Sequence, residues 1–358
     1  MVRRKCLDCV VTAILLSVIC ASVHGSKTLS IDIHGKRLEG NPLLWNPQEM
    51  CLLARDGKLE IFNPQHAKNV RTTSNSFYSY TANEMRASLY REFGRRFDVS
   101  GTGHYLVVHP RGQRDVWADR FEELYRNFTH YFRTRRILPA EPQFPLVAVV
   151  FHRQEDFLRY ATADGLNAKN YLGYYSLTSN RILLYDTTAG QSSVDWTTNG
   201  ETIIHEATHQ TANNTRIHSR FGYTPRWVAE GLATMFEARG VWNPQRYRER
   251  ADRIHRARLQ GFRRYQKGHN LSRLVQMITY DRMFESQPDI AYAEAWALTF
   301  FLAELEPRKY GAYLQKTASR KPFEEYTATQ RQKDFTDIFG KDLAMLDARL
   351  TRFIKQLP

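Results

Sequence analysis

The residues best suited to chemistry lie close together in the second half of the chain. His205, Glu206 and His209 form the pattern His-Glu-x-x-His. Side chains four residues apart share one face of a helix, so both imidazoles can reach a single ion if this segment is helical. Zinc suits such a site because it accepts nitrogen and oxygen ligands tetrahedrally. Glu206, beside the first histidine, is then placed to act as a general base on a water molecule at the metal.

Two downstream carboxylates can complete the ligand set. Glu230 follows His209 by 21 positions, which leaves room for a loop and a returning helix that begins at Pro225. Glu237 lies seven residues further along a similar helix face, so it is either a rival ligand or a group that orients a ligand. Two histidines and one glutamate would leave a fourth coordination position for water.

Other zinc-binding layouts fit the chain less well. The metzincin pattern requires a glycine and a further histidine at the positions that hold Ala212 and Thr215, and no His-x-x-Glu-His is present. The remaining layout is the gluzincin one, with the third ligand supplied by a separate helix.

Helices and strands that would position these residues can be read from spacing and caps. Thr198-x-x-Glu201 is a capping box that predicts the start of the metal-binding helix, and Thr81-x-x-Glu84 predicts an earlier helix ending at Gly94. Apolar patterns predict strands at 105–109 and 146–151, an aromatic-rich helix between them, and a hairpin at 174–185. Beyond the hairpin the pattern is mainly helical, so the fold class is α+β.

The N-terminal residues predict a secreted protein. Arg3, Arg4 and Lys5 precede a short apolar run from Val10 to Val23, and the small residue Gly25 follows; this order is typical of a signal peptide at residues 1–25. Short alternating segments then predict a small β module at residues 26–66, and the domain that carries the candidate zinc site would occupy 67–358. Cys51 is the one cysteine outside the signal, so an internal disulfide scaffold is excluded. A secreted or periplasmic location follows, with no membrane span after cleavage.

The net charge of +14 favours acidic partners, such as an acidic envelope polymer. Much of this charge lies between Arg239 and Lys267, and we interpret that segment as a solvated helix face. No nucleic-acid recognition motif accompanies it, so no specific nucleic-acid partner is expected.

The segments His205–Gln210 and Trp227–Ala233 resemble the peptidase-MA-like gluzincin superfamily. The similarity is greatest to a secreted planctomycete family catalogued as domain of unknown function 1570. Supporting segments are Thr102–Tyr105, Leu172–Tyr175, Asn180-Arg181 and Tyr292–Trp296. The resemblance implies a zincin-like, thermolysin-like core, with Zn²⁺ held by His205, His209 and Glu230 and with Glu206 as the base. It implies no substrate.

The expected function is that of a secreted zinc metallopeptidase, which hydrolyses peptide bonds with a zinc-activated water. By resemblance to related peptidases, Tyr292 is the first choice as hydrogen-bond donor to the oxyanion, with Tyr223 and His218 as alternatives. The hairpin at 174–185 would offer an edge strand to an extended peptide or protein substrate. The alternative is a catalytically silent zincin fold that binds the cell envelope or has a structural role.

Overall fold

The computed structural model describes residues 27–112, 116–187 and 196–358. The signal peptide predicted at residues 1–25 lies outside these ranges. No helix within them is both long and apolar enough to span a membrane.

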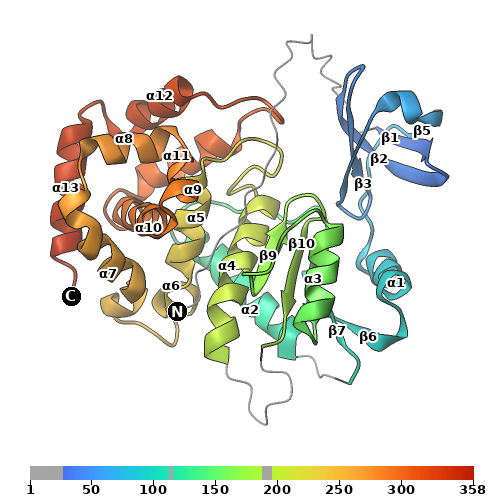
Figure 1. The fold of residues 1–358 in the computed structure, drawn as a ribbon, viewed down its shortest axis with the longest axis horizontal. Helices are drawn as coiled ribbons and strands as arrows, with labels where there is room; N and C mark the ends of the chain where they lie inside the picture. Colours follow the sequence, from blue (N-terminus) through green and yellow to red (C-terminus); the bar gives the residue numbers. More distant parts are fainter. Residues whose placement is uncertain (1–26, 113–115, 188–195) are drawn as a thin grey trace.

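The N-terminal part is an antiparallel five-stranded sheet in the order β4-β3-β2-β1-β5 (Figure 1). Its strands are β1 (Thr28–Ile33), β2 (Lys36–Trp45), β3 (Met50–Ala54), β4 (Leu59–Phe62) and β5 (Lys68–Ser74). Leu29, Ile31, Met50 and Leu52 form a small core of its own on one face. The sheet continues past residue 66, where we predicted the boundary, because β5 pairs with β1.

A second, mixed sheet has the order β6-β7-β8-β10-β9. Its strands are β6 (Phe97–Gly101), β7 (Tyr105–Pro110), β8 (Leu146–Phe151), β9 (Gly173–Ser176) and β10 (Arg181–Tyr185). β7, β8 and β10 are parallel, whereas β6 and β9 pair antiparallel to their neighbours at the two edges. The strands predicted at 105–109 and 146–151 and the hairpin at 174–185 are confirmed.

Thirteen helices account for most of the remaining described residues. They are α1 (Ala82–Phe93), α2 (Val116–Arg133), α3 (Gln154–Ala163), α4 (Trp196–Asn214), α5 (Arg226–Phe236), α6 (Arg239–Trp242), α7 (Arg256–Tyr265), α8 (Leu271–Thr279), α9 (Met283–Ser286), α10 (Pro288–Leu305), α11 (Pro307–Ala318), α12 (Ala328–Phe339) and α13 (Leu343–Lys355). The second sheet lies between the N-terminal sheet and the C-terminal helices (Figure 1). The α+β class predicted from the sequence is therefore confirmed.

Both faces of the second sheet are buried, because alternate residues of its central strands point in opposite directions. Val107 and Ala148 belong to the core that includes α2 and α4. Val108, Val149 and Leu183 belong to a separate core with α1 and α3. The continuous apolar run of β8 reflects burial on both sides, and this packing fixes α4 against the sheet.

Three local predictions need correction. α4 begins at Trp196, so Thr198 lies in its first turn and is not the cap. Pro225 is the N-cap of α5 and not its first helical residue. The arginine-rich segment is not one helix: it forms α6, a 3-10 turn at Arg250–Arg253 and α7. Pro244 explains the break after α6, because proline lacks the amide hydrogen that a continuing helix needs.

α10 is the central helix of the C-terminal half and is buried along most of its length. It packs against α5 at Gly231, where a Cβ atom would lie only 2.6 Å from the carbonyl oxygen of Ala295 and also against Thr299. Only glycine permits this close approach, which places the neighbouring Glu230.

Candidate metal centre

α4 and α5 bring three potential metal ligands together. The Oε2 atom of Glu230 lies 3.2 Å from Nε2 of His205 and 3.7 Å from Nε2 of His209. The two imidazole Nε2 atoms are 3.1 Å apart. Among the described residues this trio is the group whose ligand atoms all lie within 4.8 Å of one another. The structure therefore brings together the three side chains that the sequence predicted as metal ligands.

The chemistry of these atoms fits a cation. Nδ1 of His205 lies 2.7 Å from Oε1 of Glu237, and an ionised carboxylate can only accept, so Nδ1 carries the proton. In the neutral imidazole, which is the form that binds a metal, the unprotonated Nε2 then faces His209 and Glu230. Oε2 of Glu230 is itself buried with no hydrogen-bond partner within the described part of the chain. Nitrogen and carboxylate oxygen atoms that converge in a buried site are the donors that a cation such as zinc binds.

Glu230 is held in its ionised form. Without a metal ion, burial acts to raise its pKa, but the nearby charges of His209 and His205 outweigh this effect, and the pKa lies well below its usual value. The pKa of Glu237 is lowered for the same reason, by hydrogen bonds from His205 and His255 that exceed the cost of burial. Of the two carboxylates left open by the sequence, Glu230 joins the cluster, whereas Glu237 binds the far nitrogen of His205.

Glu206 lies beside the cluster and contacts the edge of the sheet. Its Oε2 atom accepts a 2.7 Å hydrogen bond from the backbone amide of Tyr175 in β9. Burial is the main cause that raises the pKa of Glu206, and the nearby charge of Glu230 adds to it. A carboxylate with a raised pKa is a stronger base, which suits proton transfer near neutral pH.

Polar contacts that the sequence did not predict hold α4 on the sheet. The fully buried Gln210 donates from Nε2 to the carbonyl oxygens of Val147 (3.0 Å) and Asn180 (2.8 Å). Asn214 donates to Oδ1 of Asn180 at 2.8 Å. Asn180 sits in the β9–β10 turn with a φ of 59°, a conformation that asparagine tolerates better than most residues. Gln210 and Asn180 both lie in segments of the family resemblance, His205–Gln210 and Asn180-Arg181, which was the sequence signal for them.

The three candidate oxyanion donors have different surroundings. Tyr292 is buried on α10, with the guanidinium of Arg258 5.0 Å from its ring centre. His218 is buried, and neither of its ring nitrogens has a hydrogen-bond partner within the described residues. Burial, with the charge of His209, lowers the pKa of His218 to about 3, so it is neutral. Tyr223 is partly exposed and its hydroxyl donates to Asp281, so that hydroxyl is already engaged.

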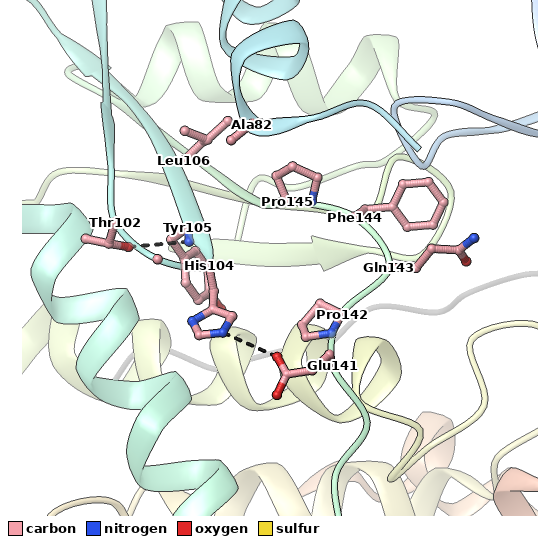
Figure 2. Close-up of a pocket in the computed structure, with 11 residues that line it drawn as sticks. Ala82, Thr102, His104, Tyr105, Leu106, Glu141, Pro142, Gln143, Phe144 and Pro145 are labelled. Atoms are coloured by element: carbon pink, nitrogen blue, oxygen red, sulfur yellow. Dashed lines mark hydrogen bonds and ion pairs between the residues drawn. The ribbon is translucent and has the colours of Figure 1, made fainter. Parts of the chain in front are cut away.

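The Thr102–Tyr105 segment lines a different feature, a pocket of about 230 Å³ beside the start of β7 (Figure 2). His104 binds the carboxylate of Glu122 through Nδ1 at 2.8 Å, and its Nε2 lies 3.5 Å from Oε2 of Glu141. The pocket lining contains none of the residues of the His205–His209–Glu230 cluster. This segment therefore belongs to a separate part of the surface.

Part of the chain is similar to a known protein family. Residues 199–324 match the family described as "Protein of unknown function (DUF1570)", which confirms the resemblance predicted from the motifs. The matched region contains the cluster, Glu206, Glu237 and Tyr292. No curated protein matches the chain.

Solved structures that resemble the chain include zinc metallopeptidases. One is a two-domain M1 zinc metallopeptidase mutant bound to L-arginine, with 12% identity, a TM-score of 0.40 and coverage of 73% of this chain and 52% of the other. Another is an M1 zinc metallopeptidase mutant from Deinococcus radiodurans, with 11% identity, a TM-score of 0.39 and coverage of 74% and 52%. This chain thus spans about half the length of these structures.

Proposed function

We propose that this protein is a zinc-dependent peptidase in which His205, His209 and Glu230 hold the metal and Glu206 is the general base. The observation that carries the proposal is the convergence of Nε2 of His205, Nε2 of His209 and the buried Oε2 of Glu230, whose ligand atoms all lie within 4.8 Å of one another. Glu206 stands next to this group with a raised pKa. All four residues lie within the region that matches the family.

A bound zinc ion supplies a Lewis acid and lowers the pKa of water towards about 7. The side chains of the protein would transfer protons and bind the substrate's oxygen. Glu206 would accept a proton and pass it to the leaving amine, while Tyr292 donates a hydrogen bond to the oxygen of the scissile carbonyl. His218 is the second candidate for that donor, because its buried ring nitrogens have no partner among the described residues.

The edge strand β9 supports the choice of an extended peptide as substrate. In the second sheet β9 pairs with β10 on one side, and the Tyr175 amide points to the other side, towards Glu206. A peptide that pairs with this edge would pass beside the general base. Secretion and an acidic envelope partner belong to the same proposal, and they rest on the N-terminal residues and on the net charge of +14.

Metal analysis and peptide cleavage together test the proposal. The purified chain without residues 1–25 is expected to contain about one zinc ion, and His205→Ala to contain none. Cleavage of a fluorogenic peptide library should stop when a chelator is added and return with zinc. Zinc without any turnover would favour the alternative, a catalytically silent binding or structural protein. Folded protein that takes up no zinc would contradict the metal site itself.

A further inference from the structure

Beyond the four site residues, α7 supplies a histidine that reaches the cluster through Glu237. Nε2 of His255 lies 2.6 Å from Oε2 of Glu237, and the other oxygen of that carboxylate lies 2.7 Å from Nδ1 of His205. Both histidine side chains and the carboxylate are largely buried, with exposed fractions of 11%, 7% and 2% for His255, His205 and Glu237. Water therefore competes little for these hydrogen bonds.

The helix cap at α7 determines which nitrogen of His255 carries the proton. His255 is the N-cap residue of α7, and its Nδ1 accepts a hydrogen bond from the backbone amide of Arg258 at 3.3 Å. A backbone amide can only donate, so Nδ1 is unprotonated and Nε2 carries the hydrogen that Glu237 accepts. The free amides at a helix N-terminus thus specify the tautomer of this ring.

A chain of hydrogen bonds runs from His255 through Glu237 to His205 of the cluster. With one oxygen occupied by His255, Glu237 offers the other to His205, whose Nδ1 must then be the protonated nitrogen. The lone pair of His205 is left on Nε2, the atom that faces His209 and Glu230. A metal ligand held in this way has its ring orientation and its basicity set in advance.

We propose that His255 is a positioning residue for the metal site, which fixes Glu237 and, through it, the tautomer and orientation of His205. This inference rests on the proposed zinc site but not on peptidase activity. Nothing in the linear pattern indicated it, because His255 lies in the arginine-rich segment 18 residues after Glu237.

Two substitutions separate the two roles of the ring. In His255→Asn the amide oxygen replaces Nδ1 as the α7 cap, but no atom reaches Glu237. In His255→Gln the longer amide can place an N–H where Nε2 was, but the cap is weaker because glutamine is a poor N-cap. Zinc affinity, measured by competition with a chromogenic chelator, and the melting temperature of the metal-free protein are compared for both variants and the wild type.

The expected result is an opposite ranking in the two measurements. His255→Asn should weaken zinc binding by about 10-fold or more while the apo protein melts near the wild-type temperature. His255→Gln should keep zinc affinity within about threefold of the wild type and melt at a lower temperature. Unchanged zinc affinity in His255→Asn, or equal losses of affinity in both variants, would overturn the proposal.

The readout also distinguishes this inference from the proposed function. Zinc affinity is measured without a substrate. A protein that binds zinc and hydrolyses nothing would therefore contradict the peptidase assignment. In that case the zinc affinities of the two variants would still decide the role of His255. A wild-type protein that binds no zinc would overturn both.

Discussion

The carboxylate of Glu206 accepts a 2.7 Å hydrogen bond from the backbone amide of Tyr175, which joins helix α4 directly to the edge strand β9. This contact holds one carboxylate oxygen of Glu206, the proposed general base. The hydrogen bond from Gln210 to the carbonyl oxygen of Asn180 also holds α4 against the sheet. The side chain that would transfer protons is therefore hydrogen-bonded directly to the strand that would bind the peptide.

Replacing Glu206 with glutamine tests its role as base. The new side chain has nearly the same size, and its amide oxygen can still accept from the Tyr175 amide, so the fold and zinc content should remain. Because glutamine cannot take up a proton, kcat should fall by about 10²–10⁴-fold. Hydrolysis rates and zinc content are measured on the same preparation. A fully active Glu206→Gln protein would show that the base lies elsewhere.

Tyr292→Phe removes one hydroxyl and keeps the ring beneath Arg258. If Tyr292 donates to the oxyanion, kcat should fall by about 10²–10³-fold with unchanged zinc content and melting temperature. Tyr223→Phe is the control, since its hydroxyl already binds Asp281, and its rate should stay near that of the wild type. An unchanged rate in Tyr292→Phe together with a large loss in His218→Gln would transfer the role to His218.

Gly231→Ala is expected to disturb both packing and metal binding. The added methyl group would lie 2.6 Å from the Ala295 carbonyl oxygen, so α5 must move away from α10 and carry Glu230 with it. We expect a loss of about 1–3 kcal/mol in the free energy of unfolding, together with weaker zinc binding. Gly200→Ala, whose methyl group meets no atom within 4 Å, is the matched control in a helix. Equal stability of the two variants would argue against the close approach.

Stability should depend on pH through His269. This buried ring binds Glu294 at 2.9 Å and Asp347 at 2.7 Å. Burial acts to lower its pKa, but these two hydrogen bonds and charges prevail and raise it from 6.5 to about 9. Because the folded protein holds the proton more tightly, this stabilisation is complete below pH 6.5 and is lost as the pH rises through about 9.

Denaturant unfolding of His269→Gln tests that dependence. At pH 6 the variant should be less stable than the wild type by about 2 kcal/mol, and the difference should shrink towards pH 10. His130→Gln, at an exposed histidine, should show a small difference that does not follow this trend. A constant gap between wild type and His269→Gln across this pH range would refute the assignment.

The sequence alone determined those features that depend only on residues within the same helix or strand. The spacing of His205 and His209 places both rings on one helix face whatever surrounds the helix, because it follows from 3.6 residues per turn. The apolar run of β8 and the capping box that begins α1 are local in the same sense, and both were predicted. The start of α4 was predicted too late in the chain, since a capping pattern does not exclude an earlier start.

The tertiary structure decided which atoms meet. Glu230 lies in α5 and Glu237 is the C-cap residue of the same helix, seven positions further on, and the sequence left both open as ligands. The contact of Gly231 with α10 sets the position of α5, so that Glu230 reaches the Nε2 side of His205 and Glu237 the Nδ1 side. His255 contacts Glu237 because the helical segment ends after α6 and the chain folds back before α7 begins. Helical periodicity fixes which side chains share a face, but only packing between elements fixes the distances between their polar atoms.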